Sequence, residues 1–174
     1  AEGRWEKHRG LEELGGKRVV IVGCGSVGRE CADRFRAFGC GIIGVGRRPC
    51  VDGFDKIYPI SELRAAASEG DIIIFCLPLT KETEDIADGE IFSAMKDGAV
   101  IVNISRGGII DTEALISELK SGRLRAALDV FEQEPLPADS ELWALPNAVI
   151  TPHNSFVGEG NRERLFALIT ENLR

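Results

Sequence analysis

A glycine-rich segment between an apolar run and a helical pattern most constrains what this chain can fold into. Residues 18–22, Arg-Val-Val-Ile-Val, are rich in β-branched side chains, which is typical of a buried strand. Gly23, Gly25 and Gly28 follow with the spacing GxGxxG, and residues 27–38 have a helical pattern. A strand, a glycine-rich turn and a helix in this order indicate a βαβ unit with an anion site at the helix N-terminus.

The rest of the chain repeats this alternation of short apolar runs and helical patterns. Further strands are expected at residues 42–45, 71–75, 99–102, 126–128 and 148–150, helices at 61–67, 86–95, 112–121 and 162–174, and an irregular connection at 49–59. Ser61 and Asp111 are expected to cap the helices that follow them. Apolar strands that alternate with helices imply a parallel sheet covered on both faces. We therefore predict an α/β fold, a Rossmann-type doubly wound parallel sheet with three αβα layers.

The length of 174 residues is enough for one domain with a sizeable core. We expect a single dinucleotide-binding domain over residues 1–174, with a polar lead-in at 1–17 and a C-terminal helix at 160–174. The chain does not start with Met and stops inside an apolar helical pattern. It is therefore expected to be one domain of a longer chain.

Charge and cysteine usage narrow the class of protein. The net charge of −7 argues against a general nucleic-acid or membrane-surface binder, and no apolar run approaches the length of a membrane span. The five cysteines form no CxxC pair and there are only two histidines, so we expect no metal site. Free thiols that pack as small apolar side chains in a reducing cytoplasm are the simplest interpretation.

The three glycines have distinct expected roles in a phosphate cradle. Gly23 permits the tight turn, Gly25 lets the backbone approach a pyrophosphate, and Gly28 allows the helix to pack closely on the sheet. Ser26 and Val27 lie at the helix N-terminus, where free N–H groups face the anion. The alternative is a strand-to-helix turn without a ligand.

The end of the second strand bears on the choice of cofactor. An NAD site normally has a carboxylate there for the ribose 2′-hydroxyl, whereas this chain has Gly44-Val45-Gly46-Arg47-Arg48. Arg47 and Arg48 suit a 2′-phosphate, because the guanidinium pairs bidentately with phosphate. We therefore expect NADP, with NAD as the alternative; two solvated loop arginines would explain the same residues without a cofactor role.

Three side chains that follow the later strands could take part in a reaction that needs a general acid or base. Arg106 lies among small residues and could bind a substrate carboxylate and polarise a carbonyl. Glu134 and His153 could form a pair in which the carboxylate fixes the imidazole tautomer and favours its protonated form. Taken singly, Arg106 could be a structural ion-pair residue and His153 a turn-packing histidine. The ordered set favours the functional interpretation.

As an ordered set, these segments resemble the nucleotide-binding domain of the D-isomer-specific 2-hydroxyacid dehydrogenases. The resemblance covers most of residues 15–155. Its landmarks are Gly23-x-Gly25-x-x-Gly28, Leu77-Pro78-Leu79-Thr80-x-x-Thr83, Asn103-x-x-Arg106-Gly107, Leu128-Asp129-Val130-Phe131-x-x-Glu134-Pro135 and Thr151-Pro152-His153.

The resemblance implies roles for the matching residues. Arg106 would orient the 2-oxoacid, His153 would act as general acid/base, and Glu134 would tune the histidine. Asp129 would lie near the nicotinamide carboxamide. The remaining cofactor contacts implied in this way are Leu77, Pro78, Thr83, Ile104 and Ser105.

The function implied by the resemblance is reversible NAD(P)-dependent reduction of a 2-oxoacid, in which His153 donates the proton. The family's substrate domain is absent from this chain, so the chain alone is expected to be inactive. A homodimer is expected by analogy with the family. This chain has Phe156 where the family usually has small residues. The main alternative is a dinucleotide-sensing module like the C-terminal-binding-protein corepressors; a methyltransferase would leave Arg106, Glu134 and His153 unexplained.

Overall fold

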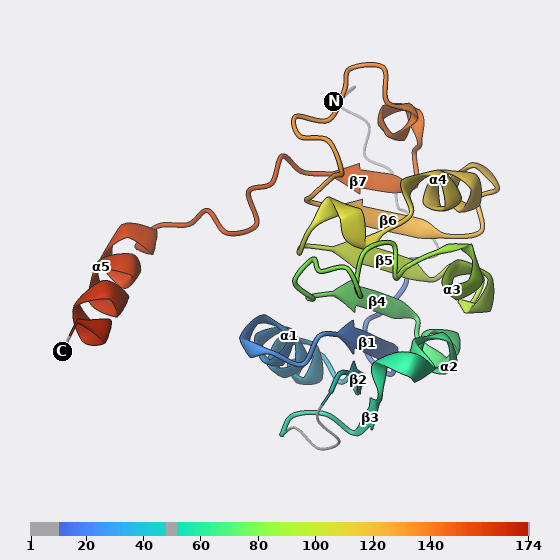
Figure 1. Ribbon diagram of the computed structural model, residues 1–174. Coiled ribbons are helices and arrows are strands. Elements are labelled where there is room, and N and C mark those ends of the chain that lie inside the picture. The colour runs from blue at the N-terminus through green and yellow to red at the C-terminus, as the bar shows by residue number, and fades with distance from the viewer. Residues whose placement is uncertain (1–10, 48–51, 174) are drawn as a thin grey trace, which may run out of the picture.

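A seven-stranded parallel sheet forms the centre of the protein, as the computed structural model shows for residues 11–47 and 52–173 (Figure 1). The strand order is β3-β2-β1-β4-β5-β6-β7, and every neighbouring pair is parallel. The strands are β1 (Arg18–Val22), β2 (Gly41–Val45), β3 (Lys56–Tyr58), β4 (Ile72–Phe75), β5 (Val100–Asn103), β6 (Arg125–Leu128) and β7 (Ala148–Ile150). This order is that of a Rossmann sheet, so the predicted fold class is confirmed.

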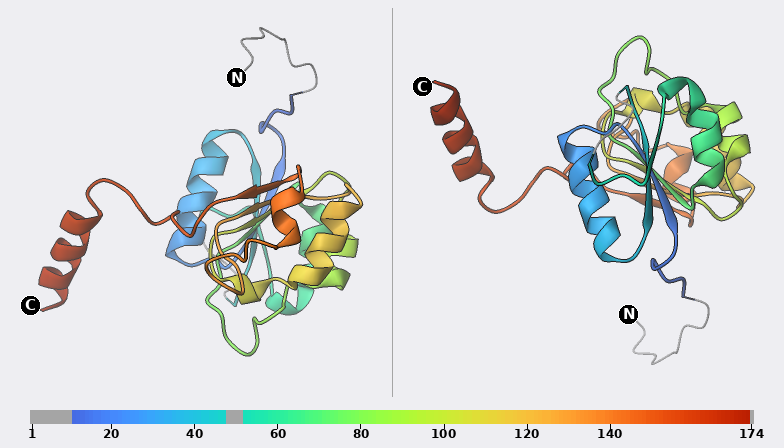
Figure 2. Two further views of the ribbon diagram at one scale, coloured as in Figure 1. Left: turned by 90° about the horizontal axis from the view of Figure 1, so that it is seen from above. Right: turned by 90° about the horizontal axis from the view of Figure 1, so that it is seen from below.

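Helices cover both faces of the sheet, which gives the three predicted layers. In Figure 2, α1 lies on one face, and α2, α3 and α4 lie on the other. The helices are α1 (Ser26–Ala37), α2 (Leu63–Glu69), α3 (Gly89–Ala94), α4 (Thr112–Lys120) and α5 (Asn161–Asn172). Among the described residues, no helix is long and apolar enough to cross a membrane.

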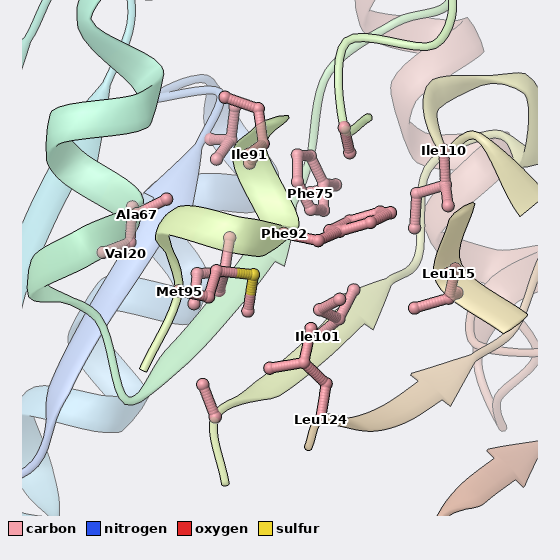
Figure 3. Close-up of a cluster of buried hydrophobic side chains, with 14 of the residues drawn as sticks. Val20, Ala67, Phe75, Ile91, Phe92, Met95, Ile101, Ile110, Leu115 and Leu124 are labelled. Atoms are coloured by element: carbon pink, nitrogen blue, oxygen red, sulfur yellow. The ribbon is translucent and has the colours of Figure 1, made fainter. Parts of the chain in front are cut away.

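Two groups of buried side chains hold these layers together. The larger lies between the sheet and helices α2 to α4, where Phe75, Phe92 and Ile101 are fully buried (Figure 3). The smaller lies beneath α1 and contains Ile21 and Ile74. Because the central strands contribute side chains to both groups, they are apolar along their whole length, which is the pattern that predicted a parallel sheet.

The starts of three helices test the caps and boundaries that the sequence predicted. Asp111 caps α4 as predicted, since its carboxylate accepts a hydrogen bond from the Ala114 N–H at 3.0 Å. The cap predicted at Ser61 is wrong: residues 60–62 form a 3₁₀ turn, and α2 begins at Leu63 without a side-chain cap. Helix α3 begins at Gly89, three residues later than predicted, because Asp88 caps it.

One further expectation differs from the structure. Residues 56–58, expected in an irregular connection, form the edge strand β3, whose pairing with β2 is a tertiary contact that three residues do not encode. In α1 the buried residues are Gly28 and Ala32, whereas Val27 is 53% exposed, because it lies in the first turn at the open edge of the sheet.

Helix α5 projects away from the rest of the protein (Figures 1 and 2). It confirms the helix predicted at the C-terminal end, but none of its residues is buried. Its exposed apolar side chains are Leu165, Phe166, Leu168 and Ile169. The helix therefore takes no part in the core that positions the site.

Candidate active site

The parallel topology brings five loops to the carboxyl edge of the sheet. Loops 23–28, 76–83, 103–108, 129–135 and 151–155 follow or end strands β1, β4, β5, β6 and β7. Strands β1 and β4 are neighbours although the chain between them passes through β2 and β3, so the direction of winding reverses there. Ligands of open α/β sheets bind at this kind of crevice.

Gly23 and Gly28 are required by backbone contacts inside the first loop. Gly23 has a φ of +110°, and a Cβ there would lie 2.8 Å from the carbonyl atoms of Cys76. A Cβ on Gly28 would lie 2.0 Å from the Gly23 carbonyl oxygen. Gly23 therefore fixes how closely the loop after β4 approaches β1, and Gly28 fixes how closely α1 approaches it.

Gly25 differs, because the space beside it is open. A Cβ built there meets nothing within 4 Å. Gly25 is the N-cap residue of α1, no side chain caps that helix, and Ser26 and Val27 are exposed. The helix thus presents free N–H groups and the positive end of its dipole to an open space, and these features fit a pyrophosphate.

The end of β2 has close packing but no carboxylate in residues 44–47. A Cβ on Gly44 would lie 2.7 Å from the Cys24 sulfur, so β2 packs directly on the glycine-rich loop. Arg47 is exposed beside this contact. Asp55 is bound at the opposite end of β2, where it accepts from the Ile42 N–H at 2.7 Å. Arg48 lies outside the described residues.

The loop after β4 is closed by Thr83. Its hydroxyl donates to the Pro78 carbonyl at 2.7 Å and accepts from the Thr80 N–H at 2.8 Å. Pro78 is exposed and Leu77 is half-buried against the larger core. In this structure the Thr83 hydroxyl therefore shapes the loop that was predicted to contact the cofactor.

Asn103 organises the loop that carries Arg106. It is 1% exposed; its amide donates to the Arg106 carbonyl at 2.9 Å, and its oxygen accepts from the Ser105 hydroxyl at 2.9 Å and N–H at 3.1 Å. Ile104 packs against the smaller core. The Arg106 side chain is exposed, and one N–H donates to the Ser105 carbonyl at 2.6 Å. In the sequence, the signal for this structural role of Asn103 was its position at the end of an apolar strand.

Gly107 joins the Arg106 loop to the loop after β6. A Cβ on Gly107 would lie 1.8 Å from the Phe131 carbonyl carbon and 2.2 Å from the Glu132 nitrogen. The two backbones therefore touch, and only glycine fits between them. Because Arg106 precedes this contact directly, the position of its loop is set relative to the loop that carries Glu134.

Asp129 holds the loop that carries His153. Asp129 is 3% exposed, and its carboxylate accepts hydrogen bonds from the Thr151 hydroxyl at 2.5 Å, the Asn154 N–H at 3.0 Å and the Ser155 N–H at 2.9 Å. Burial raises the pKa of Asp129, but the bonds from Thr151, Ser155 and Asn154 outweigh it and lower the pKa to about 2. An ionised Asp129 thus stabilises the turn at His153, whose φ of +48° is unusual for a side chain of this size.

Glu134 and His153 form the predicted pair. The Nδ1 atom of His153 lies 2.6 Å from Glu134 Oε2, and Glu134 Oε1 accepts from the Phe131 N–H at 3.0 Å. The hydrogen bonds from His153 and Phe131 lower the pKa of Glu134, so its carboxylate is ionised at neutral pH. An ionised carboxylate only accepts, so Nδ1 carries a proton and Nε2 remains for proton exchange.

Phe156 packs edge-on against the imidazole, with the ring centroids of Phe156 and His153 5.7 Å apart at 90°. Phe156 is the residue at which this sequence departs from the pattern of the family that it resembles, and the departure adds an aromatic contact to His153. Within residues 11–47 and 52–173, no three His, Cys, Asp or Glu side chains gather to hold a metal ion.

Comparison with known proteins gives one consistent family. The profile of the D-isomer specific 2-hydroxyacid dehydrogenase, NAD binding domain, matches residues 1–155. The hydroxypyruvate reductase of Thermotoga maritima is 44% identical over 158 residues, which are 87% of this chain and 50% of that protein. The chain spans about half the length of this relative.

Solved structures agree with the sequence relatives. A D-isomer specific 2-hydroxyacid dehydrogenase family protein from Aeromonas salmonicida matches with a TM-score of 0.89 and 37% identity, over 97% of this chain and 54% of the other. An NADPH-dependent glyoxylate/hydroxypyruvate reductase from Sinorhizobium meliloti, solved with NADP and sulfate, matches with a TM-score of 0.86 and 30% identity, over 97% and 54% of the two chains.

Proposed function

This chain belongs to the D-isomer specific 2-hydroxyacid dehydrogenase family as its NAD-binding domain, and on that premise we propose that it is the cofactor-binding half of an NADPH-dependent reductase of small 2-oxoacids. The observation that carries the proposal is the Glu134–His153 pair, whose Nδ1 contact leaves Nε2 for a proton transfer. The matched hydroxypyruvate and glyoxylate reductases support the substrate class.

In the proposed reaction His153 is the general acid. The imidazolium donates its Nε2 proton to the carbonyl oxygen as that oxygen becomes a hydroxyl, and Glu134 stabilises the charged ring throughout. Asp129 keeps the turn at His153 in place through its bonds to residues 151–155. The proton donor therefore stays in one tautomer and one position, which reduces the cost of reaching the reactive geometry.

Arg106 is the proposed substrate-binding cation. Its guanidinium is exposed, and one of its N–H groups is bonded to the Ser105 carbonyl. Since a guanidinium has five N–H donors, the others remain able to bind the carboxylate and polarise the carbonyl of a 2-oxoacid. The Gly107 contact places this cation on the loop that abuts the Glu134 loop.

The residues present fit a dinucleotide, because the space beside Gly25 is open and the N-terminus of α1 is uncapped. Gly25, Ser26 and Val27 would hold the pyrophosphate, and Arg47 with Arg48 the 2′-phosphate that distinguishes NADP. The remaining proposed contacts are Leu77, Pro78, Thr83, Ile104, Ser105 and Asp129. A reduced nicotinamide bound at this edge supplies the hydride that the reduction needs.

A substrate panel tests the proposal. The complete protein that contains this chain is assayed with glyoxylate, hydroxypyruvate and larger 2-oxoacids, with NADPH and NADH in parallel. Turnover with NADPH that disappears in His153→Ala supports a reductase. Dinucleotide binding without turnover, coupled to capture of a peptide partner, would instead favour the corepressor-like sensor. Residues 1–174 alone should bind the dinucleotide with rates near background, because the proposed substrate domain that closes the cleft is not part of them.

Assembly and location are further parts of the proposal. A homodimer is expected by analogy with the family, and light scattering of the complete protein measures it. A cytoplasmic location fits the free thiols of Cys24, Cys31, Cys40 and Cys76, since reducing compartments keep thiols in this state. Fractionation of the source cells checks that location.

A further inference from the structure

Three of the described cysteines gather beneath the glycine-rich loop, although none has a role in the proposed reaction. Cys24 belongs to the loop, Cys31 to α1, and Cys76 directly follows β4. The Cys24 thiol points to β2, where it donates weakly to the Val45 carbonyl at 3.6 Å. The other two, Cys31 and Cys76, pack against one and the same group of buried side chains.

The fold places Cys31 and Cys76 in one layer. Side chains alternate along β4 and its extension, so Ile72, Ile74 and Cys76 point to the same face of the sheet. Cys31 lies on the face of α1 that covers this side, one helical turn after Gly28. Both cysteines pack against the same group of buried side chains, and each thiol shifts the pKa of the other.

This contact makes the two thiols chemically unequal. The hydrogen bond from Cys76 is the largest influence on Cys31 and, with Arg34 assisting against burial, lowers the pKa of Cys31 to about 7. Cys31 and burial raise the pKa of Cys76. Near neutral pH Cys31 is therefore a thiolate in part of the molecules, and Cys76 remains a thiol. Since the thiolate is the nucleophilic form, Cys31 is the more reactive sulfur.

We propose that Cys31 and Cys76 form an oxidisable thiol pair, a modification site at which a peroxide drives formation of a disulfide that weakens dinucleotide binding. The Cys31 thiolate attacks one peroxide oxygen, the O–O bond breaks, and hydroxide leaves, so that Cys31 becomes a sulfenic acid. The Cys76 sulfur then attacks the Cys31 sulfur and displaces the hydroxyl, which leaves as water with the Cys76 proton. The two sulfurs lose two electrons, and the peroxide gains them.

The disulfide would act on the phosphate cradle through the backbone. An S–S bond of about 2.05 Å is much shorter than the separation of two sulfurs that are not bonded, so α1 and residue 76 must approach each other. The Cys76 carbonyl already lies against Gly23, with no room for even a Cβ. The approach therefore displaces the glycine turn, which sets the position of the Gly25 N–H groups. This step rests on dinucleotide binding at that loop, whereas the thiol chemistry does not.

Peptide mapping tests the pair directly. The reduced chain is treated with hydrogen peroxide, free thiols are blocked, and the protein is digested with trypsin. Cleavage after Lys and Arg puts every cysteine in a separate peptide, with Cys31 in 30–34 and Cys76 in 65–81. The expected product is a disulfide between these two peptides. A bond from either residue to Cys24, or irreversible oxidation without a bond, would overturn the pairing.

Single variants test the order of attack. In Cys76→Ser, and equally in Cys76→Ala if the serine variant is unstable, a dimedone adduct should accumulate on Cys31. In Cys31→Ser no adduct should form on Cys76. Cys40→Ser is the matched control, because Cys40 is buried at the other end of the sheet and should leave disulfide formation unchanged. An adduct on Cys76 in Cys31→Ser would reverse the assigned roles.

Calorimetric titration with NADPH and NADH then measures the effect on the cradle. We expect the oxidised chain to bind about tenfold or more weakly than the reduced chain, with full recovery after dithiothreitol, because small displacements of binding groups have large effects. The oxidised Cys31→Ser variant should keep the affinity of its reduced form. Equal affinities of the oxidised and reduced wild-type chains would overturn the regulatory effect. If even the reduced chain binds neither cofactor, the proposed function fails, while the mapping still decides the thiol pair.

Discussion

The carboxylate of Glu134 lies 2.6 Å from Nδ1 of His153, and its other oxygen accepts from the backbone of Phe131. Both carboxylate oxygens are therefore fixed, one by the ring and one by the loop. The carboxylate cannot rotate without breaking a hydrogen bond, so it holds the imidazole in a single tautomer. The imidazole that we propose as the proton donor therefore has a fixed orientation at the carboxyl edge of the sheet.

Removal of the imidazole should abolish most of the activity. In the proposed reductase, His153→Ala should lower kcat by roughly 10²–10⁴-fold, the usual loss for a general acid. Steady-state kinetics with a 2-oxoacid and NADPH measure this change. Arg106→Ala provides the contrast, because it should raise KM as well as lower kcat. An unchanged kcat in His153→Ala would assign the proton to another group.

Removal of the carboxylate charge should change the pH dependence of reduction. Glu134 is ionised, because the bonds from His153 and Phe131 lower its pKa, and a negative charge stabilises the imidazolium. In Glu134→Gln that stabilisation of a positively charged ring is absent, so the pH optimum for reduction should move downward. The pH–rate profile measures the shift. Glu132→Gln is the control, since Glu132 accepts from Thr112 and should leave the profile in place.

Two glycine substitutions in the same loop should affect different properties. Gly25→Ala should change dinucleotide binding, and Gly28→Ala should change the stability of the fold. Gly25→Ala adds a methyl group to open space, so stability should change by less than about 1 kcal/mol while the methyl group obstructs the pyrophosphate. Gly28→Ala forces a Cβ against the Gly23 carbonyl and should destabilise the fold by about 1–3 kcal/mol. Urea unfolding and dinucleotide titration of both variants separate the two effects. If Gly25→Ala binds the dinucleotide with unaltered affinity, the pyrophosphate does not bind at this loop.

Asp129 should contribute to stability in a defined pH range. Its folded pKa is lowered to about 2, so the contribution is present above the unfolded value near 3.9 and is lost as pH falls through about 2. The linked free energy is about 2–3 kcal/mol for a shift of this size. Urea midpoints of wild type and Asp129→Asn should therefore differ most at pH 5–7 and converge toward pH 2. A constant difference over that range would show that the carboxylate charge is not involved.

The arginines after β2 should determine the preferred cofactor. NADPH should bind more tightly than NADH, and the preference should weaken as salt rises. Replacement of Arg47 and Arg48 by Ala should weaken NADPH binding by about 1.5–3 kcal/mol for each charged hydrogen bond to the 2′-phosphate that is removed, and should leave NADH binding unaffected. Calorimetric titration with both cofactors measures these affinities. Tighter binding of NADH to the wild-type protein would contradict the assigned role of the arginines.

The sequence predicted those features that are local or that follow from topology. The strands other than β3, the Asp111 cap and the pairing of Glu134 with His153 are of this kind, because periodicity and strand order place them. The bonds of Asp129 to the His153 loop and the contact of Gly107 with Phe131 are different. They depend on which loop atoms meet in three dimensions, and nothing in the spacing of residues reports a carboxylate that faces two backbone N–H groups. Strand β3 was missed for the same reason.

The contact between Gly107 and the Phe131–Glu132 peptide distinguishes two kinds of substitution: those that move the two loops and those that leave the loops in place. The spacing between the loop that carries Arg106 and the loop that carries Glu134 is set here by main-chain atoms, because there is no room for a side chain at Gly107. The side chain of Leu79, which lies against Gly108, is not part of this backbone contact, so substitutions of Leu79 can change the surface beside the proposed substrate site without moving the two loops.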